Sequence, residues 1–141
     1  MRRKPNQTGQ ATVFVLGMAL VALGVTAFAI EGTRAFLMRR TLQNAADAAA
    51  VAGASQLDRS SYYASGGRET LVDVTLAETT AASWLERRGL DVDAAVEATP
   101  EEVRIVLRTD LPTPFLRLVG IDSVPVSGSA TAEPLVGEPG G

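Results

Sequence analysis

An uncharged apolar run occupies residues 11–30, and its only polar members are Thr12 and Thr26. Twenty helical residues at ~1.5 Å each give about 30 Å, the thickness of the hydrocarbon core of a bilayer. Residues 31–57 contain no proline and consist mainly of strong helix formers. The pattern therefore predicts one continuous helix from about Gln10 to about Ala54. Its first part, 11–30, is predicted to span a membrane, and residues 31–57 to project from it.

The projecting half carries a stripe of small apolar side chains at the three- and four-residue spacing of one helix face. Its members are Leu42, Ala45, Ala46, Ala49 and Gly53. Small side chains allow another backbone to approach closely. We therefore expect the stripe to pack against the chain's own domain or against neighbouring copies; a solvated helix that contacts nothing is the remaining alternative. Gln43 and Asp47 have the spacing to hydrogen-bond along the polar side.

A polar segment ending in two glycines, residues 58–67, predicts a loop after this helix. An apolar stripe over residues 73–88 predicts a second helix. Thr75 and Glu78 have capping-box spacing at its start, and Gly89 is a suitable C-cap. The stripe includes Trp84, the only tryptophan, which we expect to anchor the core of the domain.

Alternating apolar and polar residues predict short strands over 91–99, 102–111 and 124–132. A Leu-Pro-Thr-Pro sequence (111–114) separates the last two, and we expect residues 115–119 to form a helical turn. In this prediction, the turn plugs the sheet, which means that Phe115, Leu118 and Val119 are buried against it. The fold class is α+β: a long N-terminal transmembrane helix continuing into a small domain with a second helix and a small antiparallel sheet.

Composition excludes several classes of function. The chain has neither Cys nor His, which removes disulfides, the usual zinc, copper and haem sites, and histidine-based catalysis. Net charge is +5 over residues 1–40 and −8 over residues 41–141, so nucleic acid is not an expected partner of the acidic domain. No acid–base constellation is visible. We predict that the protein is not an enzyme and uses no cofactor or metal.

One ion pair is predicted where the helix would leave the lipid. Glu31 and Arg34 stand three residues apart on the helix, a spacing that brings their side chains together. Two interpretations stay open. The two residues form an interfacial pair whose charged groups reach toward water, or they form an assembly contact with another protein.

Two segments carry a resemblance to a known family. Gly-Gln-Ala-Thr-Val (9–13) opens the apolar helix, and residues 39–54 contain Leu-Gln-Asn-Ala-Ala-Asp-Ala-Ala (42–49). This region resembles the N-terminal region of TadE/TadG-like proteins of Flp (tight adherence) pilus systems, and residues 120–132 are similar to the C-terminal strand of short members. The resemblance implies a pilin-like domain and a role as a minor pilin or assembly factor. Its expected partners are the lipid bilayer and other pilus subunits or assembly-platform proteins, with homo- or hetero-oligomers through the Ala-rich helix left open.

The resemblance also implies a processing site between Gly9 and Gln10. Related prepilins carry a glutamate five residues after the cleaved glycine, whereas Phe14 stands there in this chain.

The expected organisation has five parts: a cytoplasmic tail (1–10), a transmembrane helix (11–30), a projecting helix (31–57), an extracytoplasmic α+β domain (58–133) and a disordered tail (134–141). Lysine and arginine are balanced across the apolar run, so orientation follows from the resemblance: N-terminus in the bacterial cytoplasm, domain outside. The alternative is a secreted binding module released by signal-peptide cleavage near Ala29, after the basic residues 2–4. The apolar run is longer than the usual core of a signal peptide, which favours the anchored form.

Overall fold

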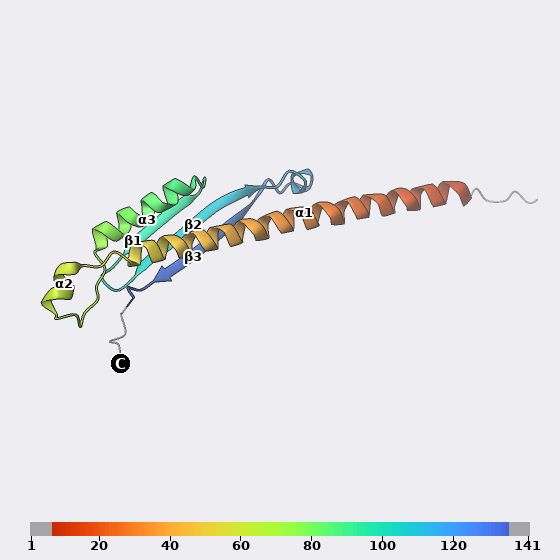
Figure 1. Cartoon of the computed structure of the whole chain (residues 1–141). Helices are drawn as coiled ribbons and strands as arrows, with labels where there is room; N and C mark the ends of the chain where they lie inside the picture. Colours follow the sequence, from red (N-terminus) through yellow and green to blue (C-terminus); the bar gives the residue numbers. More distant parts are fainter. Residues whose placement is uncertain (1–6, 136–141) are drawn as a thin grey trace, which may run out of the picture.

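The computed structural model describes residues 7–135. Residues 1–6 of the predicted cytoplasmic tail and residues 136–141 of the predicted disordered tail lie outside the described residues. The elements, in chain order, are α1 (Gln7–Ala54), α2 (Arg59–Ala64), α3 (Val74–Arg88), β1 (Asp93–Ala98), β2 (Val103–Pro112), the 3-10 turn η1 (Leu116–Val119) and β3 (Ser123–Ala132). The predicted α+β class is confirmed: a long helix leads into a small domain of helices and antiparallel strands (Figure 1).

Helix α1 runs for 48 residues and begins three residues before the predicted start. It includes a stretch long and apolar enough to cross a membrane, and none of that stretch is buried by the rest of the chain. Figure 1 shows this first half extending away from the domain, while the second half lies along the sheet. The helix therefore has two environments, with the change near Glu31, which is buried.

The strands form an antiparallel sheet in the order β1-β2-β3. Val103 pairs with both Ala98 of β1 and Ala132 of β3, and Pro112 pairs with Ser123 at the far end of the β2–β3 hairpin. Helix α1 contacts β2 and β3, α3 contacts β1, and the two helices contact each other. Both helices therefore share one face of the sheet, and the domain has two layers.

The core lies between these layers and is unusually rich in small residues. Val103, Ile105 and Leu107 alternate along β2 on the helix-facing side, and all three are completely buried. The helices meet them mainly with alanines, together with Leu42 of α1 and Leu85 of α3. Trp84 is not the core anchor that we predicted: it is only partly buried at the margin of the core. Its ring instead supports the Arg88 guanidinium, 4.7 Å from the ring centroid, a cation–π contact.

The segment predicted as a loop over 58–67 contains the short helix α2, so that prediction was wrong for residues 59–64. Asp58 caps this helix, since its carboxylate accepts hydrogen bonds from the backbone N–H groups of Ser60 and Ser61. An aspartate with serines two and three residues after it was the available signal. The two glycines form the turn that follows, both with positive φ angles.

The second helix starts one residue later than predicted and has a different cap. Asp73, not Thr75, is the N-cap, and its carboxylate accepts from the N–H of Leu76 at 3.1 Å. The C-cap prediction is confirmed: Gly89 has a left-handed backbone, φ 61°, and its N–H donates to Glu86. The capping-box prediction was based on the spacing of Thr75 and Glu78, whereas the cap is the aspartate at the predicted first residue of the helix.

The helical turn predicted at 115–119 exists as η1, but it does not plug the sheet. Phe115 is 46% exposed, Leu118 88% and Val119 74%. The β2–β3 hairpin extends to Pro112 and Ser123, so its tip projects beyond α3 and lies beside α1 alone (Figure 1). The tip's apolar side chains consequently have no core to enter.

The projecting half of α1 is part of the core, so the domain should depend on it. We expect a fragment of residues 58–141 to be poorly folded, because its remaining core is too small to offset the entropy of folding. A fragment of residues 41–141 should show a cooperative thermal transition by circular dichroism. Equally high melting temperatures for the two fragments would show that α1 is not part of the folding unit.

Candidate functional site

The stripe of small residues on α1 packs against the chain's own domain. Leu42, Ala46 and Ala49 are completely buried, and Ala45 is 3% exposed. The closest approach is at Gly128 of β3, where an added Cβ would lie 2.6 Å from both the backbone nitrogen of Gln43 and the carbonyl carbon of Leu42. Backbone meets backbone there, and only glycine allows it.

Gly53 makes the second close approach, at the other end of the stripe. A Cβ at this position would lie 3.1 Å from the Ala77 carbonyl oxygen of α3 and 3.1 Å from a methyl carbon of Val103 on β2. The stripe thus meets α3 and the sheet at once. Its face is occupied by the same chain and is not open to a neighbouring copy in this structure.

Gln43 fastens the helix to the edge of the sheet. Its Nε2 donates to the Ser129 carbonyl oxygen at 2.8 Å, and its Oε1 accepts from the Ser129 N–H at 3.3 Å. The bond to Asp47, predicted from spacing, is also present at 3.1 Å. Because β3 is an edge strand, the Gln43 amide satisfies backbone groups that would otherwise offer a template for another strand. Sequence reasoning missed this role, since no local pattern relates residues 43 and 129.

Glu31 lies beneath the tip of the β2–β3 hairpin. Its side chain is 2% exposed, and its Oε1 accepts from the N–H of Phe115 at 3.0 Å. Arg34 pairs with the other carboxylate oxygen at 3.4 Å and also donates to the Pro112 carbonyl oxygen at 3.5 Å. A buried carboxylate is tolerated when it is paired and hydrogen-bonded in this way. The two residues therefore tie the helix to the hairpin tip.

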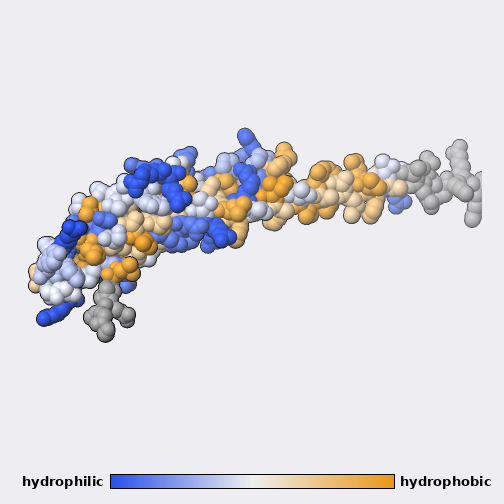
Figure 2. Space-filling model, viewed as in Figure 1, coloured by the Kyte–Doolittle hydropathy of each residue, from blue (hydrophilic) through white to orange (hydrophobic). Residues whose placement is uncertain are grey.

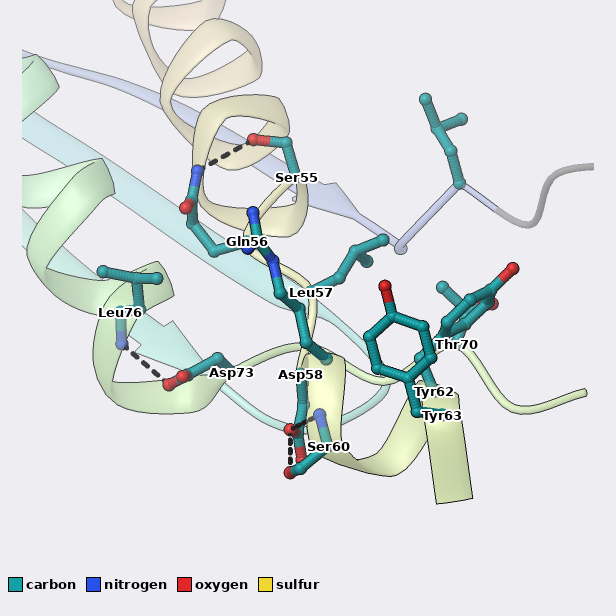
Figure 3. A pocket seen from close by; sticks show the side chains of 12 residues that line it. Ser55, Gln56, Leu57, Asp58, Ser60, Tyr62, Tyr63, Thr70, Asp73 and Leu76 are labelled. Carbon is teal, nitrogen blue, oxygen red and sulfur yellow. Dashed lines mark hydrogen bonds between the residues drawn. The ribbon is translucent and has the colours of Figure 1, made fainter. Parts of the chain in front are cut away.

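An open cleft of about 600 Å³ lies at the opposite end of the domain, between the end of α1, α2 and the start of α3. Figure 3 shows the Tyr62 and Tyr63 rings beside Leu57 and Thr70 in this cleft. Hydrogen bonds from the Ser60 and Ser61 hydroxyls lower the pKa of Asp58 from 3.8 to about 2. A carboxylate of such low basicity is poorly matched to general-base catalysis near neutral pH.

Metal binding has no support in the described part of the chain. No group of three or more acidic, cysteine or histidine residues there is arranged to hold an ion.

The processing position implied by the resemblance lies in the first turn of α1. Gly9 and Gln10 are both exposed, and Phe14, on the next turn, is 70% exposed. The structure places these residues on an accessible helix, about 20 residues before the domain begins to cover α1 at Glu31.

A comparison with family models gives one match. Residues 9–56 match the family described as "Putative Flp pilus-assembly TadE/G-like". Over these residues the chain is TadE/G-like. The resemblance expected for the N-terminal region is thereby confirmed, whereas the similarity expected for residues 120–132 lies outside the match and stays a prediction. The matched segment coincides with α1 from the apolar first half to the last turn of the buried stripe. No curated protein and no solved structure matches the chain.

Larger side chains in the stripe should destabilise the domain. Ala46→Leu would overpack a completely buried position, and Gly128→Ala would place a Cβ against the backbone of α1. Each should lower the free energy of unfolding by roughly 1–3 kcal/mol. The measurement is chemical denaturation of a residue 41–141 fragment.

Asn44→Leu is the matched control, because Asn44 lies on the same helix but is exposed. A change within about 0.5 kcal/mol is expected there. Equal effects of leucine at positions 44 and 46 would contradict the close packing of the stripe. Gln43 is unsuitable as a solvent-facing control because it binds Ser129.

Helix α2 should loosen in acid. The pKa of Asp58 is about 2 in the folded protein and 3.8 without its partners, so its cap stabilises α2 fully above pH 3.8, and this contribution is lost as the pH falls through about 2. Amide NMR shifts of Ser60 and Ser61 should follow this titration. Asp58→Asn should abolish it, and a midpoint near 3.8 would mean that the serine hydroxyls do not bind the carboxylate in solution.

Proposed function

We propose that this protein is a membrane-anchored minor pilin or assembly factor of a Flp/Tad-type surface pilus that acts by helix packing and not by catalysis. In this proposal residues 11–30 lie in the bacterial cytoplasmic membrane, the N-terminus is cytoplasmic, and the domain of residues 58–133 is extracytoplasmic. The observation that carries the proposal is the division of a single TadE/G-like helix into an exposed apolar half and a half built into a folded domain.

Exposure of the first half supports a lipid environment. Residues 11–30 have no charge, and large apolar side chains such as Phe14, Leu23 and Phe28 are at least 67% exposed. Exposing so much apolar surface to water is strongly unfavourable. A bilayer covers such a helix on all sides, and its backbone hydrogen bonds are already satisfied within the helix.

Burial of the stripe determines which surfaces remain for partners. The Ala-rich face is used within the chain, so contacts with other pilus components must use other positions. Three large apolar side chains stay exposed on the part of α1 beyond Glu31: Phe36, Leu37 and Val51. Together with the apolar first half, they are the positions where α1 can pack against another subunit or an assembly-platform protein.

A secreted binding module remains the competing form. Cleavage near Ala29 would leave Glu31, the stripe and the whole domain in place, so it would release a folded protein. Processing after Gly9 would instead leave the apolar run at the new N-terminus. These forms differ in mass and in their association with membranes.

The test is fractionation of producing cells, a carbonate wash of the membranes and mass determination of the N-terminus. We expect the protein to stay in the washed membranes with a start at Met1 or Gln10, because about 20 apolar residues hold it in the bilayer. A soluble form that starts at Ile30 would overturn the anchored function and establish the secreted one.

Orientation is tested in the same cells. The chain has no cysteine, so Tyr63→Cys introduces a single thiol in the domain at an exposed position. An impermeant thiol reagent should label it from outside the cytoplasmic membrane. If the reagent labels the thiol only when it has access to the cytoplasmic side of the membrane, the domain faces the cytoplasm and the proposed orientation is wrong.

A further inference from the structure

Four apolar side chains at the tip of the β2–β3 hairpin project away from the domain core. We call them the tip patch: Phe115, Leu118, Val119 and Ile121. Leu118 and Val119 are 88% and 74% exposed, and the other two are nearly half exposed. Four exposed large apolar residues within seven positions form a contiguous patch, and such patches mark surfaces that another apolar phase covers.

The tip that carries this patch has a defined structure. Thr113 is buried, its hydroxyl donates to the Ile121 carbonyl oxygen at 2.6 Å, and its N–H donates to the Asp122 carbonyl oxygen at 3.0 Å. Gly120 ends η1 with a left-handed backbone, φ 89°, and its N–H donates to Arg117. These bonds fix the backbone in a form that presents the apolar side chains outward.

The tip lies beside α1 at the point where the proposed span ends. The N–H of Phe115 donates to Glu31, which directly follows the last residue of the apolar run. Ala27 lies one turn earlier on the same side of the helix, and it is the one residue among positions 9–30 that is partly covered. The tip is the part of the domain nearest to the uncovered half of α1 (Figure 1).

The apolar surface is continuous between the two elements. Figure 2 shows hydrophobic residues around the hairpin tip, where the apolar half of α1 emerges from the domain. Basic side chains accompany it: Arg34, Arg39 and Arg40 follow on α1 and Arg117 stands within η1, all exposed. Arginines beside apolar residues suit the boundary between lipid headgroups and acyl chains.

We propose that the tip patch inserts into the interfacial layer of the bilayer next to the span, so that the membrane holds the domain at two points. This inference rests on the proposed membrane anchoring, which places the start of α1 in lipid. Lipid is the occupant because the patch continues the lipid-facing surface of α1, and the Glu31 bond holds it at the level where that surface ends. With the tip inserted, the domain no longer rotates freely about the α1 axis.

The experiment uses single labels on the full-length chain. Because the protein has no cysteine, Leu118→Cys, Met18→Cys and Tyr63→Cys each provide one thiol for an environment-sensitive fluorophore. Each labelled protein is reconstituted into vesicles of phosphatidylcholine and phosphatidylglycerol that contain lipids with a nitroxide quencher either near the headgroup end or near the middle of the acyl chain, so that both shallow and deep labels can be quenched. All three positions are exposed, so the labels should not disturb the fold.

We expect blue-shifted emission and clear quenching at positions 118 and 18, and neither at position 63 in the distal cleft. Quenching at 18 with position 118 behaving like position 63 would overturn the inference and leave the anchoring intact. No quenching at 18 would overturn the anchoring and this inference with it. Weak quenching at position 118, together with crosslinking of that position to another pilus protein in cells, would show that a protein and not lipid covers the tip patch. The inference would then be wrong.

A charge substitution tests whether the apolar side chains themselves hold the tip in lipid. In the Leu118-labelled protein, Val119→Glu should remove most of the quenching, since an ionised carboxylate disfavours insertion. Ser127→Glu is the matched control, because it adds the same charge at an exposed site on β3 outside the tip patch, and it should leave the quenching unchanged. Equal quenching in the two variants would overturn the proposal, as the label would then be near lipid only because of the neighbouring span.

Discussion

The close approach of α1 to the sheet at Gly128 is the contact on which the remaining structure depends. At this position the helix and strand backbones are separated by less than the width of a side chain. The short alanine side chains of α1 can therefore reach β2 and β3 and leave no gap between the layers. Buried area per alanine is small, and the stabilisation comes from the number and closeness of contacts rather than from large side chains. A larger residue at Gly128 would force the helix and the strand apart at this point. The helix, the sheet and α3 thus form one unit, and the apolar first half of α1 extends rigidly from it.

Glu31 gives this unit a defined position relative to the proposed membrane. A carboxylate buried at the boundary is costly unless each oxygen has a partner, and here Phe115 and Arg34 provide the partners. The same residue thereby ends the uncharged run in the sequence and fixes the hairpin tip in the structure. Glu31 therefore links the proposed membrane span, which it directly follows, to the hairpin tip, which is the proposed second membrane contact.

At the distal end of the domain, short-range polar bonds add to the packing of the core. Asp58 and Asp73 cap α2 and α3, and backbone hydrogen bonds link the segment before α3 to the end of α1 and to Pro100. The open cleft with Tyr62 and Tyr63 lies here, and helix α2, which carries both tyrosines, lies far along the molecule from the apolar half of α1 (Figure 1). The two ends of the protein therefore differ in chemistry: apolar with arginines at one, polar with tyrosines at the other.

Local patterns in the sequence determined the length of α1, its uncharged first half, the stripe on its second half and the strand alternation that buries Val103, Ile105 and Leu107. These features follow from periodicities that a segment carries by itself. The caps at Asp58 and Asp73 were also local signals, although the sequence pattern predicted a loop at the first and a different cap at the second. What only the tertiary structure decided were the relations between distant segments. Gly128 lies against Gln43, Glu31 lies under Phe115, Trp84 lies at the margin, and the residues expected to plug the sheet stay exposed at its tip. A side chain's burial depends on which segment the chain brings opposite to it, and that partner is specified by the whole packing rather than by any local run of residues.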